Sequence, residues 1–103
     1  MITFSDSVYR VVKTIPKGKV STYKAIAEAL NNKAYRAVGN ALNRNQYAPV
    51  VPCHRVISSN GSLGGFKSGI KNKINLLKKE NIIIKNNRID LNKYFFKIKK
   101  ERA

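Results

Sequence analysis

Apolar side chains recur at the spacing of an α-helix in the first part of this chain. A helix is expected over residues 5–15, where apolar residues at i, i+3, i+4 and i+7 make one stripe. Ser5 or Thr3 can cap its start, and the turn at Pro16-Lys17-Gly18 ends it. The inward stripe consists of Val8, Val11, Val12 and Ile15.

Two shorter helices follow, expected over Tyr23 to Leu30 and Ala34 to Asn43. Their inward residues are Ile26, Ala27, Leu30, Val38, Ala41 and Leu42. Two short helices joined by a tight turn indicate a helix-turn-helix. Glycine inside a helix costs about 1 kcal/mol relative to alanine, so Gly39 marks a close approach by another surface. Packing against another helix of the chain is an equally weighted explanation.

The second half of the chain mixes short strands with one helix. We expect a strand at Val56-Ile57, followed by a turn over residues 58–61. A fourth helix over residues 70–80 has one apolar face. That face consists of Ile70, Ile74 and Leu77. Residues 82–91 predict a small hairpin around Asn86-Asn87.

The elements together predict a mainly α fold with small β elements, of the helix-turn-helix and winged-helix-like type. One domain is expected over residues 1–92, because no linker or repeat divides the chain. A basic, aromatic tail follows over residues 93–103. It can dock as a helix or stay loose, and the pattern leaves both alternatives open.

Charge narrows the class of partner. The chain has 21 Lys and Arg against 5 Asp and Glu, a net charge of +16, and no acid lies between residues 29 and 79. Such self-repulsion is most easily tolerated when the partner is a polyanion, and nucleic acid is the first candidate. An anionic membrane surface is second, since the central region lacks a long basic amphipathic helix. A bias toward Lys, Ile and Asn codons would not explain the missing acids.

Several other classes of protein fit poorly. No apolar run approaches the roughly 18 residues of a membrane span, and the N-terminus lacks the basic start and apolar stretch of a signal peptide. A single cysteine makes no internal disulfide, which agrees with a reducing compartment. We therefore expect a cytoplasmic protein with no membrane partner.

The only cysteine and the only histidine are adjacent, at Cys53 and His54. A free thiol has a pKa near 8.5 and is mostly protonated at neutral pH, so a neighbouring imidazole can activate it by taking its proton. Adjacent side chains of an extended segment point to opposite sides, and direct contact is therefore not assured. The alternative is a small buried cysteine of no chemical role.

Three blocks of the sequence resemble the C-terminal domain of O6-alkylguanine-DNA alkyltransferases, over about Phe4 to Leu91. The blocks are Gly18-Lys19-Val20-Ser21-Thr22-Tyr23 with Ile26-Ala27, then Arg36-Ala37-Val38-Gly39-Asn40-Ala41-Leu42 with Asn45, then Pro52-Cys53-His54-Arg55-Val56 with Asn60-Gly61, Gly64-Gly65-Phe66 and Leu76-Leu77-Lys78-Lys79-Glu80. The resemblance implies direct repair of double-stranded DNA that contains O6-alkylguanine. The damaged nucleotide is flipped out, and Cys53 keeps the alkyl group as a thioether, without turnover, metal or cofactor.

The resemblance also implies roles for the reactive residues. Cys53 is the nucleophile, His54 is its base through a bridging water, and Glu80 is the carboxylate that orients the histidine. Tyr23 binds the flipped base and helps protonate the leaving guanine. Asn45 braces the reactive turn.

Other matched positions concern DNA. Arg36 fills the space that the flipped base leaves, which suits a planar guanidinium. Ala37 and Gly39 let the helix press into the minor groove, and Arg44 contacts DNA beside them. The remaining matched positions form the base pocket. They are Val56, Phe66, Lys67 and Ser68, of which Lys67 also contacts DNA.

The chain departs from the family in two respects. Members usually carry an N-terminal domain, sometimes with a structural metal, and we expect none here. Phe66 stands where many members have Tyr.

We expect a monomer; cooperative binding along DNA stays open. The alternative function is that of a non-catalytic alkyltransferase-like protein, but those relatives replace the cysteine. A helix-turn-helix regulator with an incidental cysteine is a third hypothesis.

Overall fold

The computed structural model describes residues 3–45, 50–64 and 69–99. Its order is α1 (Phe4–Val12), β1 (Ser21–Thr22), α2 (Tyr23–Ala29), α3 (Tyr35–Asn43), the 3-10 turn η1 (Cys53–Arg55), β2 (Val56–Ile57), α4 (Ile70–Lys79), β3 (Ile84–Lys85), β4 (Arg88–Ile89) and α5 (Leu91–Tyr94). The prediction of a mainly helical fold with small β elements is confirmed. Among these residues, no helix has both the length and the apolar character needed to cross a membrane.

Helix α1 begins as expected but ends early. Thr3 caps it in a capping box with Asp6, and its apolar stripe is buried. The helix ends at Val12, whereas the prediction extended it to residue 15. Thr14 donates its backbone N–H and its hydroxyl to the carbonyl of Val11 (3.0 and 2.6 Å), which closes the last turn. The following Pro16 disfavours helical geometry at residue 15.

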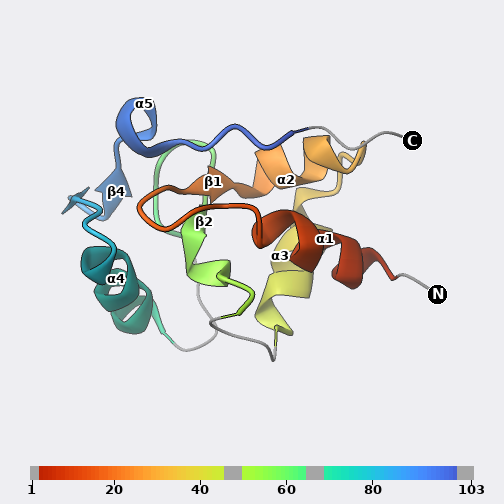
Figure 1. Cartoon of the computed structure of the whole chain (residues 1–103), viewed down its shortest axis with the longest axis horizontal. Helices are drawn as coiled ribbons and strands as arrows, with labels where there is room; N and C mark the ends of the chain where they lie inside the picture. Colours follow the sequence, from red (N-terminus) through yellow and green to blue (C-terminus); the bar gives the residue numbers. More distant parts are fainter. Residues whose placement is uncertain (1–2, 46–49, 65–68, 100–103) are drawn as a thin grey trace.

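Helices α1, α2 and α3 pack together on one side of the molecule, and α4 lies on the other side with the β3–β4 hairpin (Figure 1). Strands β1 and β2 run between the two groups and pair in parallel, with Ser21 opposite Val56 and Thr22 opposite Ile57. Successive strand side chains point to opposite faces. Val56 accordingly packs in the core of α1–α3, and Ile57 packs in the core beside α4. The segment that carries Cys53 thus leads into the junction of two small cores.

The predicted apolar face of α4 is wrong at one position, Ile70. Leu77 is fully buried and Ile74 is half-buried, but Ile70 is 40% exposed. Lys73, one turn before Leu77, is buried instead. The pattern failed here because a lysine is normally counted as a surface residue.

The described part of the tail docks, mostly as extended chain. After one turn of α5, the backbone N–H of Phe96 donates to the carbonyl of Val20 (2.7 Å), and that of Val20 donates to the carbonyl of Tyr94 (2.9 Å). Phe96 and Ile98 then pack against the core of α1–α3. The tail therefore covers the edge of β1 that β2 leaves open.

Candidate active site

Cys53, the predicted nucleophile, lies in a tight double turn and not in extended chain. Pro52, at φ −82° and ψ 69°, has the geometry of an inverse γ-turn, and the N–H of Cys53 donates to the carbonyl of Val51 (2.8 Å). One 3-10 turn follows, with the N–H of Arg55 donating to the carbonyl of Pro52 (3.0 Å). The expectation of an extended segment is wrong because the fixed φ of proline favours this turn.

Asn45 lies beneath this turn. Its side chain is 6% exposed, and its Nδ2 donates to the carbonyl of Val51 at 2.9 Å. The same carbonyl accepts the N–H of Cys53. Two donors thus converge on one carbonyl, two residues before the cysteine, which holds the backbone of the turn in place.

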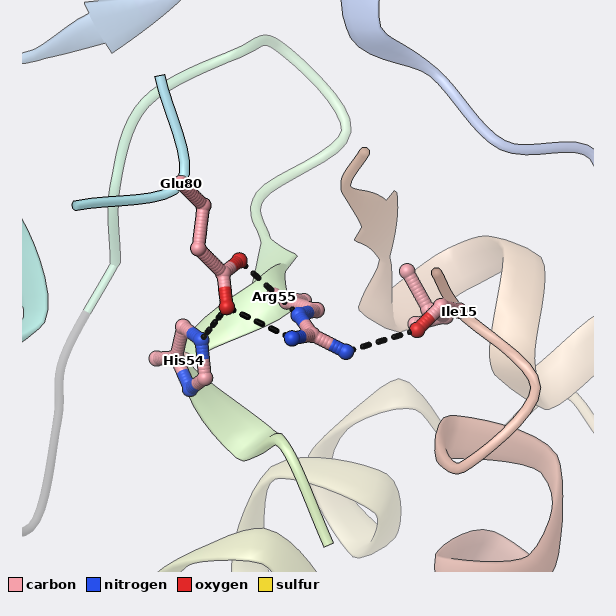
Figure 2. A network of polar contacts seen from close by, with 4 residues as sticks. All are labelled: Ile15, His54, Arg55 and Glu80. Atoms are coloured by element: carbon pink, nitrogen blue, oxygen red, sulfur yellow. Dashed lines mark hydrogen bonds and ion pairs between the residues drawn. The ribbon is translucent and has the colours of Figure 1, made fainter. Parts of the chain in front are cut away.

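His54 and Glu80 meet although 26 residues separate them. Nε2 of His54 lies 3.0 Å from Oε2 of Glu80, and both side chains are buried (Figure 2). Glu80 reaches the site because it is the C-cap residue of α4. A carboxylate only accepts, so Nε2 carries the hydrogen and Nδ1 keeps its lone pair. The imidazole is therefore in the tautomer that can accept a proton at Nδ1.

Arg55 completes this network, and the sequence analysis assigned it no role. Its Nε donates to Oε1 of Glu80 (2.9 Å), and one terminal nitrogen donates to Oε2. The other terminal nitrogen donates to the carbonyl of Ile15 at 2.9 Å, at the end of the α1 segment (Figure 2). The only signal for this role in the sequence was the scarcity of acidic residues, because it leaves few carboxylates with which any arginine can pair.

The network shifts two pKa values in a consistent way. Burial alone would raise the pKa of Glu80, but hydrogen bonds from Arg55 and His54 outweigh burial and hold that pKa below its usual value. Burial lowers the pKa of His54, with help from the cations of Arg55 and Lys73 and against the pull of Glu80. Glu80 is therefore an anion and His54 a neutral base at neutral pH.

Tyr23 faces the same site from the start of α2. The parallel pairing of β1 with β2 brings it there, since Tyr23 directly follows β1. Burial raises the pKa of the Tyr23 phenol, and the electrostatic interaction with Cys53 adds to this. Gly64 lies against the ring: a Cβ there would be 3.4 Å from the Tyr23 hydroxyl, and its φ of +70° suits glycine.

The predicted base pocket is described in part. Val56 is fully buried, and Phe66, Lys67 and Ser68 lie outside the described residues. The structure adds Lys73, which no motif had indicated. Its Nζ donates to the carbonyls of Val56 and Leu63, each at 2.7 Å. Its position in the apolar stripe of α4 was the only signal.

The predicted DNA-binding residues lie on a different surface. Arg36 is exposed in the first turn of α3, and Ala37 and Gly39 are half-buried along the same helix. A Cβ on Gly39 would meet no described atom within 4 Å, so packing within the described part of the chain does not explain this glycine. Arg44, exposed at the C-cap, donates to the hydroxyl of Ser5 at 3.3 Å and so also joins α3 to α1.

Comparison with known proteins gives the family. Residues 3–82 match the DNA-binding domain of 6-O-methylguanine DNA methyltransferase. The chain belongs to this family. It is 51% identical to the methylated-DNA--protein-cysteine methyltransferase of Methanosarcina mazei over 78 residues, which are 75% of this chain and 49% of that protein. The chain spans 30% to 50% of the length of three of the curated relatives it matches.

Solved structures of family members have the same fold. The O6-methylguanine-DNA methyltransferase of Pyrococcus kodakaraensis superposes with a TM-score of 0.71 at 45% identity, covering 77% of this chain and 46% of that one. Atl1 of S. pombe, solved with damaged DNA containing O6-carboxymethylguanine, superposes with a TM-score of 0.84 at 32% identity. This second match covers 94% of this chain and 97% of Atl1.

Proposed function

We propose that this protein repairs double-stranded DNA by direct reversal, moving an alkyl group from O6 of guanine to Cys53. One observation carries the proposal. This chain belongs to the family, and its only cysteine, Cys53, lies in the turn that Asn45 holds in place. The next residue, His54, is hydrogen-bonded to Glu80 at 3.0 Å. A thiol, a neutral imidazole and an orienting carboxylate are the parts needed to make a thiolate at neutral pH.

The proposed step balances without a cofactor. Nδ1 of His54 accepts the thiol proton through a water, and the sulfur of Cys53 attacks the alkyl carbon. The S–C bond forms as the C–O6 bond breaks, and the electron pair stays on the guanine. Tyr23, whose raised pKa keeps its phenol protonated, donates to the leaving base. The proton on His54 then passes through water to the Tyr23 phenolate, which restores both groups. The thiol hydrogen is thereby exchanged for the alkyl group, so each protein acts once, as a monomer.

The α3 face supports DNA as the partner. An O6 atom inside the duplex is out of reach of the buried Cys53, so the nucleotide must be flipped out. Arg36 is exposed where it can enter the stack, and the open space over Gly39 lets a groove come close. The net charge of +16 favours binding to phosphates.

Recognition of damage without transfer is the second candidate function. The similarity to Atl1 supports it, because that DNA-bound protein matches nearly the whole of this chain at nearly equal length. The presence of Cys53 beside His54 argues for transfer.

Intact mass spectrometry tests the proposal. The protein is incubated with a short duplex carrying one O6-methylguanine, and with the same duplex carrying guanine as the control. We expect a stoichiometric gain of one methyl group, mapped to Cys53, with the lesion duplex only. Tight, lesion-selective binding without a mass gain would establish the second candidate instead.

A further inference from the structure

Lys73 is a buried cation in a protein with an excess of cations. Its side chain is 0% exposed, and its Nζ donates to the carbonyls of Val56 and Leu63 at 2.7 Å each. Removing an ammonium from water is costly, and close hydrogen bonds offset only part of that cost. Leu77, one turn later on the same stripe, shows that an apolar residue fits this face of α4.

The two carbonyls bound by Lys73 lie close to the candidate site. Val56, a predicted residue of the base pocket, directly follows η1, and Leu63 directly precedes Gly64, which lies against the Tyr23 ring. The ammonium also lies 6.0 Å from the centre of the Tyr23 ring. One side chain thus connects the strand that follows the Cys53 turn, Leu63 and Tyr23.

Lys73 also adds to the charges around the thiol. Its cation interacts with Cys53 and with His54, and it acts from α4. The other ionisable groups of this centre are Tyr23 from α2, Arg55 from η1 and Glu80 at the end of α4.

We propose that Lys73 is a positioning residue of alkyl transfer: its buried ammonium holds Val56, directly after the turn that carries Cys53, and Leu63 at one spacing and keeps a positive charge at this site. The proposal rests on the proposed function, whose substrate this pocket would hold. An ammonium suits the task because its three donors can bind two carbonyls and still face a third group. If Lys73 served packing alone, neither its hydrogen bonds nor its charge would affect the rate of transfer.

The first test compares Lys73→Met with Lys78→Met. Lys78 is exposed on the same helix, so both variants lose one positive charge from α4. We expect single-turnover methyl transfer from the lesion duplex to fall about 100-fold in Lys73→Met, the scale of a misplaced reactive group. Transfer by Lys78→Met should stay within about twofold of wild type, because exposed charges interact weakly with the site.

Circular dichroism and binding to undamaged duplex serve as folding controls. Transfer by a folded Lys73→Met within about threefold of the control would overturn the proposal.

A second readout separates this proposal from the proposed function. The rate at which iodoacetamide alkylates Cys53 at pH 7 needs no DNA. It should drop in Lys73→Met, because the positive charge beside the thiolate is lost, and stay unchanged in Lys78→Met. A purely structural role predicts the opposite, an equal or faster reaction as the site loosens. If wild-type protein fails to repair the lesion, the proposed function fails, and this comparison still tests the electrostatic role of Lys73.

The pH profile of the wild-type protein keeps the proposal testable if Lys73→Met does not fold. Burial lowers the pKa of Lys73 to about 8. Above about pH 8 the ammonium loses its charge, whereas Lys73→Arg stays charged. The ratio of the wild-type transfer rate to the Lys73→Arg rate should therefore fall between about pH 7 and 9.5, since all other groups of the site are common to both proteins. A ratio that stays constant over this interval would contradict the assignment.

Discussion

The centre around Cys53 and the outer face of α3 differ in how they are held. In the centre, polar side chains are buried and hydrogen-bonded within the chain: Asn45 to the turn, His54 and Arg55 to Glu80, and Lys73 to two carbonyls. On the face of α3, Arg36 is exposed and Gly39 borders open space. Under the proposed function, the fold preorganises the reaction centre and leaves the DNA-binding surface open for its partner.

Charge is distributed differently in the two regions as well. The chain has only 5 acids, and Glu80 lies at the centre, against His54 and Arg55. Removing one partner from a buried ionic network leaves the others uncompensated. The α3 face carries its cations in water, where each contributes little to folding and is available to phosphates. Substitutions in the centre should therefore change chemistry, and substitutions on α3 should change binding.

The sharpest division between the regions is expected from Cys53→Ala. Methyl transfer should be abolished, because the attacking atom is gone, whereas affinity for lesion duplex should change by no more than about twofold since the variant removes one small atom. Intact mass and fluorescence anisotropy measure the two properties on the same samples. A methyl gain by this variant would move the nucleophile to another residue. Loss of binding would show that the two regions are not separate.

A smaller loss is expected from Glu80→Gln. The amide cannot hold His54 as a carboxylate does, so the transfer rate should fall about 100-fold, the lower range of general-base contributions. The free energy of unfolding should fall by about 1.5–3 kcal/mol, since charged hydrogen bonds are lost. Glu28→Gln, exposed on α2, removes the same charge and serves as the control. Equal rates for the two variants would exclude a role for Glu80 in activating His54.

On the outer face of α3, Arg36→Ala should reduce the rate of methyl transfer from lesion duplex by about tenfold, as expected for one lost contact of about 1–2 kcal/mol. Binding to undamaged DNA should change less, because the guanidinium is expected to act on the flipped state. Lys85→Ala, exposed on β3, is the matched control for charge. Repair of a lesion in single-stranded DNA should be less affected than repair of the duplex. If both substrates lose equally, Arg36 does not support flipping.

Acidification should weaken the centre before it affects the α3 face. The pKa of His54 is lowered on folding, so the unfolded chain takes up a proton first, and stability falls as pH drops below about 6.5. The pKa of Glu80 is also lowered, so the stability it contributes is present above its ordinary value of about 4.3 and is lost as pH falls through the folded value. Urea unfolding at pH 7, 5.5 and 4 should show a loss on the order of 1 kcal/mol in the first interval. His54→Gln should remove that first loss. A loss of the same size in the variant would assign it to other groups.

Local pattern predicted the helices well and the connections between them poorly. Val38, Ala41 and Leu42 are buried as their spacing indicated, because helical periodicity is a local property. The strand at Val56-Ile57 was predicted, but its parallel pairing with Ser21–Thr22 was not, because a pairing between residues far apart in the chain has no local signal. That pairing is what brings Tyr23 to the site.

The candidate site divides in the same way. The motif indicated Cys53, His54 and Glu80, and the structure brings the last two together at 3.0 Å. Arg55 and Lys73 were missed because arginine and lysine usually lie on the surface, and their burial here depends on tertiary packing. A basic residue in an apolar stripe was the one signal that pattern analysis could have used for Lys73.

The smallest predicted effect tests the α3 face most directly, through Gly39→Ala. A Cβ at this position meets no described atom of the chain within 4 Å, so alanine should stabilise the free protein by about 0.5–1 kcal/mol through its higher helix propensity. The same Cβ would project into the space that the minor groove is proposed to occupy, so affinity for DNA should fall while the iodoacetamide rate at Cys53 stays unchanged. Thermal unfolding and anisotropy measure the opposed effects, and Asn40→Ala, exposed at the next position of α3, is the control. A variant that is more stable and binds as well as wild type would leave the glycine without a role at a DNA surface. A variant that is less stable would show that the free protein already uses this position for packing.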